Sequence, residues 1–134
     1  MLRHKLFRLK NKKLILAAAI IYFIITIILL TIPGSDLPKN DWLDKIWFDK
    51  WVHIGLFAIW VWLWCLYANS TASASSLKKI FIYITITGIC YGVIMEFVQR
   101  YWIPHRSFDT GDIIADAVGC LLAFFYCSGR YIKK

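Results

Sequence analysis

The amino-acid sequence predicts an all-α protein that crosses a membrane as a bundle of four helices. Of its 134 residues, 60% are hydrophobic and 18% are charged, whereas soluble domains are about 45–50% apolar and about 25% charged. The apolar residues also gather in four blocks, each close to the roughly 20 residues that a helix needs to cross a bilayer. This composition excludes a disordered chain, a secreted disulfide scaffold and a soluble nucleic-acid-binding protein.

We expect one domain over residues 1–134, with spans that follow the apolar blocks. The predicted spans are 14–32, 51–67, 80–98 and 113–129. The first block follows a basic segment, as the core of a signal peptide does, but its 19 residues exceed the roughly 7–15 residues of such a core. No cleavage site of small residues follows this block, so we expect it to be retained as a helix.

The connections between the first three blocks differ in character. Pro33 and Pro38 favour a turn, after which Asn40 or Asp41 supplies an N-cap for a short helix. Apolar residues would share one side of that helix: Trp42, Leu43, Ile46 and Trp47. Because such a helix favours the level of the lipid headgroups, we expect an interfacial or re-entrant segment here. The second connection, residues 69–76, is rich in Ser, Thr and Ala and predicts an exposed loop.

The placement of charge predicts the orientation. Eleven of the 16 Lys and Arg residues lie in segment 1–13, at Lys78 and Lys79, or after Gly129, and all eight acidic residues lie in the other half. Because Lys and Arg favour the cytoplasmic side of a membrane, we expect both termini in the cytoplasm, with residues 1–13 as a basic tail. The net charge of +8 then indicates a lipid bilayer, and not nucleic acid, as the partner.

Three groups of polar residues lie within or beside the spans, where a charged side chain is costly and usually marks a site. The first is Asp49-Lys50-x-x-His53, at the start of the second span. On a helix, Asp49 and His53 are neighbours at i,i+4, and Lys50 is three residues from His53. A second interpretation stays open, in which Lys50 extends to the headgroups and His53 is a polar residue of the interface.

The second group is Gly88-x-x-x-Gly92-x-x-x-Glu96-x-x-Gln99, on the third span. Steps of four, four and three residues place all four on one helical face. The two glycines predict close packing against another helix. Glu96 lies one to two turns inside the outer boundary, and we expect it to need a partner or a proton.

The third group begins in the last connection and continues along the fourth span. Ser107 or Asp109 is expected to cap this span, with Asp112 in its first turn beside the positive end of the helix dipole. Asp116 lies on the same face one turn deeper, and like charges at this spacing repel. We therefore expect a cation or a shared proton there, and close packing at Gly119.

Because spans two, three and four carry these groups at their outer ends, we expect them to converge on one outward-facing polar pocket. Its predicted members are Asp49, Lys50, His53, Glu96, Gln99, Arg106, Ser107, Asp112 and Asp116. Lys50 and Arg106 are the candidate cations. No residue is assigned a catalytic role, no cofactor is expected and no metal site is predicted, although His53, Glu96 and Asp112 are weak candidates for one.

Together the three groups resemble the VanZ-like family, small bacterial membrane proteins named after an accessory protein of teicoplanin resistance. The motifs that carry the resemblance are Asp49-Lys50-x-x-His53, Tyr91-Gly92-x-x-x-Glu96-x-x-Gln99, and Arg106-Ser107 followed by Asp112, Asp116 and Gly119. The resemblance covers about residues 30–129 and implies an envelope role in the bacterial cytoplasmic (inner) membrane, in glycopeptide tolerance or the handling of cell-wall precursors. Where the family usually has Asn, this chain has Asp116.

Three functions are compatible with such a pocket. The first is a non-enzymatic envelope protein that binds a polar headgroup, a lipid-linked precursor, a glycopeptide or another membrane protein, including a second copy. The second is a membrane enzyme that acts on a lipid-linked or headgroup substrate through His, Glu and Asp acid–base or metal chemistry. The sequence carries no zinc-protease helix motif and no Ser or Cys nucleophile motif, which favours the first function. A transporter or proton relay is least favoured, because the inner half of the spans carries no charge.

Overall fold

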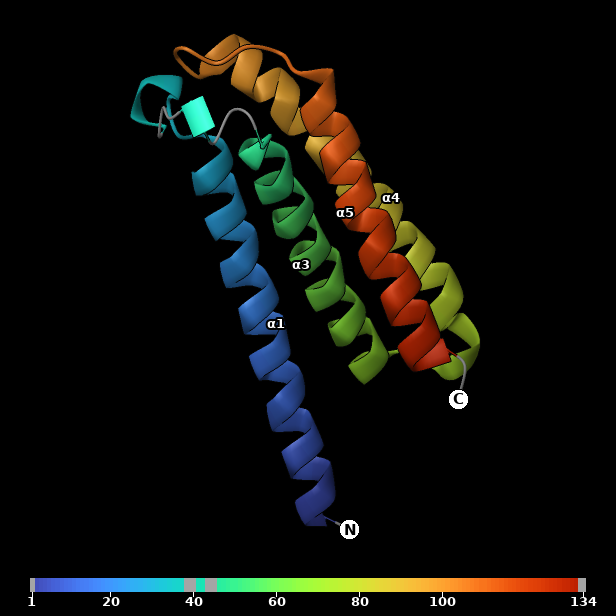
Figure 1. Cartoon of the computed structure of the whole chain (residues 1–134). Coiled ribbons are helices and arrows are strands. Elements are labelled where there is room, and N and C mark those ends of the chain that lie inside the picture. The colour runs from blue at the N-terminus through green and yellow to red at the C-terminus, as the bar shows by residue number, and fades with distance from the viewer. Residues whose placement is uncertain (1, 38–40, 43–45, 133–134) are drawn as a thin grey trace.

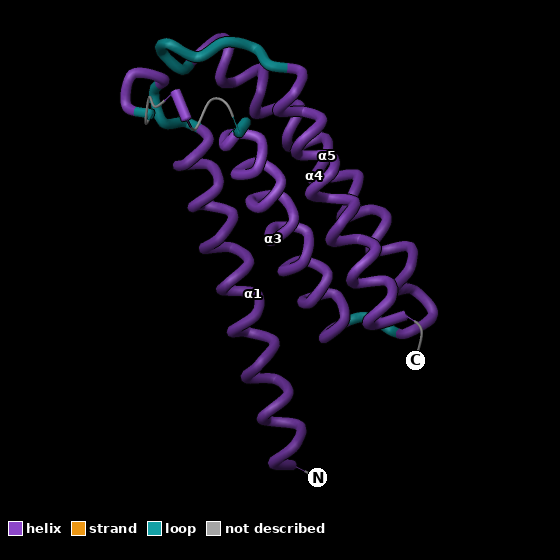
Figure 2. Tube along the Cα trace, viewed as in Figure 1, coloured by secondary structure: helices purple, strands orange, loops and turns teal. Residues whose placement is uncertain are grey.

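The computed structural model describes residues 2–37, 41–42 and 46–132, with side chains from residue 11 onward. Its long helices are α1 (Leu2–Leu30), α3 (Phe48–Thr71), α4 (Ala74–Trp102) and α5 (Thr110–Cys127). Two short turns, η1 (Gly34–Asp36) and the π-helical η2 (Ser128–Ile132), follow α1 and α5 (Figure 1). The described residues contain no strand (Figure 2), so the predicted all-α fold is confirmed.

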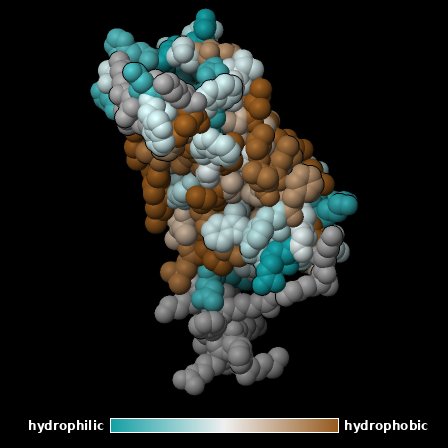
Figure 3. Space-filling model, viewed as in Figure 1, coloured by the Kyte–Doolittle hydropathy of each residue, from teal (hydrophilic) through white to brown (hydrophobic). Residues whose placement is uncertain are grey.

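Four segments are long and apolar enough to cross a membrane, as predicted: Asn11–Leu30, Phe48–Thr71, Ala74–Trp102 and Thr110–Ile132. Hydrophobic residues cover the middle of the face shown in Figure 3, and hydrophilic residues gather toward its two ends. Large apolar side chains also point outward, since Ile28, Ile86 and Leu122 are each more than half exposed. Helices that are apolar all round are typical of a lipid environment, so the chain is a multi-pass membrane protein.

The second connection differs most from its prediction. α3 continues to Thr71 and α4 begins at Ala74, so the connection is residues 72–73 alone, and the predicted loop over 69–76 is too long. The hydroxyl groups of Ser70 and Thr71 donate to the carbonyl of Tyr67, at 2.7 and 3.0 Å. Hydroxyls that bond back to the preceding turn allow polar residues to continue a helix, and a composition typical of loops therefore misled the prediction.

α3 is the central helix: it lies between α1 and α5, and α4 packs against both α3 and α5 (Figure 1). Gly119 of α5 permits the closest approach, because a Cβ there would collide with the carbonyl of Ile54 and lie 3.1 Å from the amide of Ala58. Gly88 of α4 packs in the same way against Cys120, whose Sγ would lie 2.9 Å from a Cβ. The apolar residues of the described chain that are at most 1% exposed are Ala19, Phe57, Val61, Cys65, Phe81, Cys120 and Cys127.

α1 joins the bundle through hydrogen bonds as well as through ring packing. The Tyr22 hydroxyl donates to the carbonyl of Leu56 at 3.1 Å, and the hydroxyls of Thr26 and Tyr91 lie 3.1 Å apart. The Phe23 ring packs against the Tyr91 ring with centroids 5.3 Å apart. α1 therefore contacts both α3 and α4 in the half of the bundle that leads to the loops.

The connections after α1 and α4 meet at one end of the bundle, called here the loop end. α1 ends at Leu30, two residues before the predicted boundary. The amide of Gly34 donates to the carbonyl of Pro104 at 3.1 Å, and a Cβ at Gly34 would collide with the carbonyl of His105. Glycine is thus required where the two loops touch. The start of α1 and the end of η2 both lie at the opposite end (Figure 1).

The predicted interfacial helix falls largely on residues 38–40 and 43–45, which lie outside the described residues. Of its described members, Trp42 is helical, and Ile46 and Trp47 belong to a turn just before α3. All three side chains are exposed. Exposed tryptophans in this position are typical of the headgroup level of a membrane.

Candidate functional site

The N-terminal ends of α3 and α5 form an ion-pair cluster around Lys50. Its ammonium lies 2.9 Å from Asp49 Oδ2 and 2.6 Å from Asp112 Oδ1, and it also donates to Asp109 Oδ2. The Lys50 side chain is only 18% exposed. Three carboxylates therefore share one cation that is largely removed from solvent, and Lys50 points into the protein and not toward the headgroups.

Asp109 connects this cluster to the start of α5. Its Oδ1 accepts a hydrogen bond from the amide of Gly111 at 2.7 Å, so of the two predicted N-caps the structure uses Asp109, while Ser107 lies exposed in the loop. The hydrogen bond from Lys50, together with that from Gly111, lowers the pKa of Asp109 below its usual value. Asp109 is thus held as a carboxylate at the positive end of the α5 dipole.

Glu96 and Gln99 fix two neighbouring segments to α4. Glu96 is 1% exposed and accepts a hydrogen bond from the amide of Asp109, which is the partner that the sequence left open. Gln99 Nε2 donates to the carbonyl of Leu30 at 2.9 Å. That carbonyl belongs to the last turn of α1, where carbonyls lack helical partners. One face of α4 therefore holds both the start of α5 and the end of α1.

His53 lies between two carboxylates of α5. Its Nδ1 is 2.8 Å from Asp116 Oδ1, and its Nε2 is 3.8 Å from Asp112 Oδ2. All three residues are buried. Gly92 of α4 makes room for this pair, because a Cβ there would lie 2.6 Å from Asp116 Oδ2. Asp112 and Asp116 were expected to need a cation or a shared proton, and both partners come from α3: Lys50 binds Asp112, and the His53 ring binds Asp116.

These contacts define one ionic network at the loop end, made of Asp49, Lys50, His53, Glu96, Asp109, Asp112 and Asp116. Six of the nine predicted pocket residues belong to it. Gln99 faces the end of α1, Ser107 is exposed, and Arg106 reaches a cavity beside the network. Sequence reasoning treated Asp109 only as a cap and missed its bond to Lys50. A capping aspartate uses one carboxylate oxygen, so the second oxygen of Asp109 was free to accept a hydrogen bond from a cation such as Lys50.

A cavity of about 410 Å³ adjoins the network between the end of α1 and the start of α3. Most of its walls are apolar, and they come from Leu29, Leu30, Ile32, Leu37, Phe48, Val52 and Leu56. Three charged or titratable residues complete the lining: Asp49, His53 and Arg106. The Nε of Arg106 is buried and has no hydrogen-bond partner among the described residues. This is called here the loop-end cavity.

The described residues include one group with the spacing of a metal site, formed by Asp49, Asp109 and Asp112. One carboxylate oxygen of each lies within 4.8 Å of the others. However, the ammonium of Lys50 already donates to all three, so the position that a cation would take is filled by a side chain. The weak metal candidates from the sequence, His53, Glu96 and Asp112, do not form such a group.

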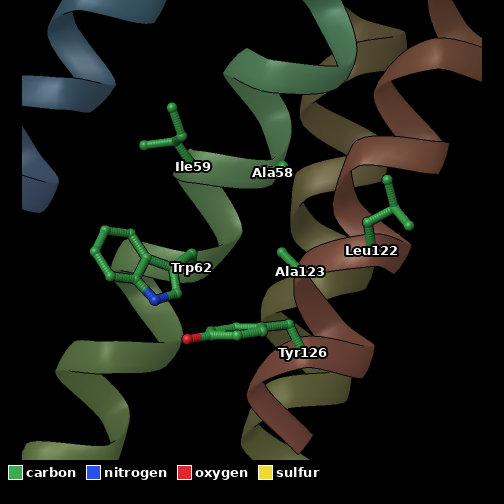
Figure 4. Close-up of a pocket in the computed structure, with 6 residues that line it drawn as sticks. All are labelled: Ala58, Ile59, Trp62, Leu122, Ala123 and Tyr126. Carbon is green, nitrogen blue, oxygen red and sulfur yellow. The ribbon is translucent and has the colours of Figure 1, made fainter. Parts of the chain in front are cut away.

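A second hollow, of about 360 Å³, lies between α3 and α5 nearer the middle of the bundle. Its lining consists of Ala58, Ile59, Trp62, Leu122, Ala123 and Tyr126 (Figure 4). The two alanines form its floor and larger side chains stand at its edges (Figure 4). Among the described residues, its lining includes no Asp, Glu, Lys, Arg or His, so this groove is mainly an apolar surface.

Comparison of the chain with protein-family models, with curated proteins and with solved structures finds no match.

Proposed function

We propose that this chain is a VanZ-like protein of the bacterial cytoplasmic membrane that binds the polar headgroup of a ligand at its loop end. In this proposal both termini are cytoplasmic and the loop end faces outward, where cell-wall precursors and glycopeptides are found. The order and spacing of the motifs around Lys50, Glu96 and Asp112 support the family, and the distribution of basic residues supports the orientation.

The observation that carries the proposal is the contact between the ionic network and a cavity with apolar walls. Buried ion pairs contribute little net stability and often less than apolar packing of the same volume. A network of seven residues at one end of a small bundle is therefore better explained by a ligand than by folding. Its cavity of about 410 Å³ lies within the range of roughly 300–1,000 Å³ that is usual for small-molecule sites.

The test uses the purified full-length chain in lipid nanodiscs, titrated with a lipid-linked cell-wall precursor and with teicoplanin. We expect saturable binding of one of them and a loss of at least about tenfold in affinity for Glu96→Gln, which removes the charge that holds the start of α5. The matched control is Asp36→Asn, a carboxylate in η1 that contacts only Ser35 among the described residues. Equal binding by wild type and Glu96→Gln would contradict the proposal.

A cellular experiment tests the envelope role separately. Teicoplanin sensitivity is compared between a deletion strain and strains that express the wild type, Glu96→Gln or Asp36→Asn at equal levels. The proposal predicts that the deletion and Glu96→Gln strains are more sensitive than the other two. Identical sensitivity in all four strains would remove glycopeptide tolerance from the proposal.

One observation favours a second candidate, a membrane enzyme that acts on a headgroup. The His53 ring is held by Asp116 at 2.8 Å through Nδ1, an arrangement that orients a general base. Against it, Asp112 lies 3.8 Å from the other ring nitrogen, where a substrate proton would have to approach. Turnover of a lipid-linked substrate that is abolished by His53→Ala but not by Ser107→Ala would favour the enzyme over the binding protein.

A further inference from the structure

The loop-end cavity has walls of two kinds and polar groups of both signs. Arg106 brings a positive charge from the loop after α4, and Asp49 brings a negative charge from the first turn of α3. Leu29 and Leu30 of α1 and Val52 and Leu56 of α3 belong to the apolar part of the lining. A ligand that satisfies this lining carries a cation, an anion and hydrocarbon in one molecule.

Resting on the proposed function, we infer that the loop-end cavity binds an aminophospholipid, with its phosphate at Arg106, its ammonium at Asp49 and the start of an acyl chain against the leucines of α1 and α3. The inference names the class of ligand that the cavity itself recognises. It is argued below from the cation, the carboxylate and the apolar walls in turn.

Arg106 supplies the phosphate contact. Its Nε is buried without a hydrogen-bond partner among the described residues, and a buried donor is normally bonded. A guanidinium presents parallel N–H groups that match two oxygens of a phosphate. His53 lines the same cavity, but both of its ring nitrogens face carboxylates of α5, so the phosphate contact depends on Arg106.

Asp49 supplies the contact to the ammonium group of the ligand, a group that a simple anion does not carry. Only one of its oxygens, Oδ2, accepts from Lys50, and its side chain is 61% exposed. The network contains five carboxyl groups, whereas the basic groups of the network and the cavity are Lys50, Arg106 and the titratable His53. An excess of acids opposes a ligand with net negative charge and favours one that brings an ammonium with its phosphate. A zwitterionic headgroup therefore fits better than an anionic one.

The position of the apolar walls indicates a lipid and not a free phosphoamine. Leu29 and Leu30 belong to the last turn of a membrane-spanning segment, and Val52 and Leu56 belong to the first turns of the next. The cavity thus begins at the headgroup level, marked by exposed Trp47, and continues toward the hydrocarbon. A chain of methylene groups gains from leaving water along such a wall.

The experiment measures which lipids stay bound to the full-length chain. Protein is purified from nanodiscs that contain equal parts of phosphatidylethanolamine, phosphatidylcholine and phosphatidylglycerol, and retained lipid is quantified by native mass spectrometry. We expect phosphatidylethanolamine to be retained at least about fivefold over each of the others. Free phosphoethanolamine, added as competitor at the same concentration, is expected to displace little of it. Equal retention of all three lipids, or full displacement by phosphoethanolamine, would overturn the inference.

Variants assign the two polar contacts. Arg106→Gln is expected to lower retention of all phospholipids by about tenfold, and Arg106→Lys, which keeps the charge but not the fork, by less. Asp49→Asn is expected to abolish the preference for phosphatidylethanolamine while phosphatidylglycerol is retained as before or better. Arg100→Gln is the matched control, because Arg100 lies over the Tyr101 ring on α4 and outside the cavity. A loss for Arg100→Gln equal to that for Arg106→Gln would overturn the inference.

The two proposals fail in different ways. If lipid selectivity is absent while Glu96→Gln still abolishes precursor or glycopeptide binding, the inference fails and the proposed function stands. If lipid selectivity is present but neither of those ligands binds, the cavity is a lipid site and the proposed envelope role fails. Size-exclusion profiles that match wild type establish that each variant is folded before either conclusion is drawn.

Discussion

The two ends of this bundle are buried to a similar degree but are held together by different forces. At the loop end, His53, Glu96 and Asp116 are each at most 6% exposed. His53 of α3 pairs with Asp116 of α5, and Glu96 of α4 accepts a hydrogen bond from the loop before α5. At the opposite end, Cys65 and Cys127 are fully buried among apolar neighbours. The same helices therefore pack without charge where no ligand is proposed. Helices of this bundle can thus pack together without charge, so the concentration of charge at the loop end is the physical reason to assign that end to binding.

Two glycines on one face of α4 show the same contrast over a single turn. A Cβ at Gly88 would lie 2.9 Å from the sulfur of Cys120, whereas one at Gly92 would lie 2.6 Å from a carboxylate oxygen of Asp116. Both follow one small-residue pattern in the sequence. One makes room for apolar packing and the other for a buried acid, so a spacing rule alone does not distinguish a packing glycine from one that shapes a site.

The largest loss of stability is expected when the buried pair of His53 and Asp116 at the loop end is broken. Asp116→Ala leaves His53 without the carboxylate that now lies 2.8 Å away, and breaking a buried pair from one side costs about 3–5 kcal/mol. Asp116→Asn keeps the shape and a hydrogen-bonding oxygen, so we expect a loss of less than half of that. The free energy of unfolding in detergent, measured by thermal or denaturant titration, checks both. Equal losses for the two variants would contradict this expectation and show that the pair acts through the carboxylate charge and not through its shape or its remaining oxygen.

A smaller loss of stability is expected when Gly88 or Gly92 is replaced, and the two variants are expected to differ in phospholipid retention. Gly92→Ala and Gly88→Ala each overfill a packed contact, which typically costs about 1–3 kcal/mol. Gly92→Ala is expected also to weaken phospholipid retention, because it displaces Asp116, whereas Gly88→Ala is expected to leave retention unchanged. Gly55→Ala is the control: a Cβ there meets no atom within 4 Å, and we expect it to be neutral or to stabilise α3 by up to about 1 kcal/mol. Equal lipid retention by Gly88→Ala and Gly92→Ala would contradict the assignment of Gly92 to the site and of Gly88 to packing alone.

Much of the loop end was predictable from the sequence because of one energetic rule. Ionisable residues at Lys50, Glu96 and Asp116 are costly in a membrane unless they meet partners, so the sequence predicted that three spans with such residues at the same end converge. The helical spacing of Asp112 and Asp116 also indicated that a cation or a shared proton was required.

The rest could not be predicted, because it depends on how separate segments lie in space. The bond from Gln99 to the carbonyl of Leu30 requires the end of α1 to sit beside α4, and no periodicity in α4 specifies that. The unpartnered Nε of Arg106 depends on the path of a loop. The second connection was mistaken because Ser70 and Thr71 satisfy their hydroxyls within α3, which composition does not reveal.

The smallest effect concerns Asp109, the network member that lies outside the membrane-spanning segments. Its pKa is lowered in the folded chain, chiefly by the hydrogen bond from Lys50. A carboxyl group with a lowered folded pKa contributes stability above its unfolded pKa of about 3.9, and this contribution is lost as the pH falls below that value. The side chain is 47% exposed, so solvent screening limits the contribution to under about 1 kcal/mol.

Asp109→Asn therefore should destabilise the protein at pH 6 by a small amount, and the difference from wild type should shrink between pH 4 and pH 3. Unfolding free energies at these three pH values measure it, with Asp36→Asn as the control for loss of a carboxylate from the other loop. A difference that grows on acidification would mean that the protonated carboxyl is the stabilising form. The interaction with Lys50 would then be a hydrogen bond to a neutral acid. The loop end would in that case depend less on pairs of opposite charge and would be more like the uncharged opposite end.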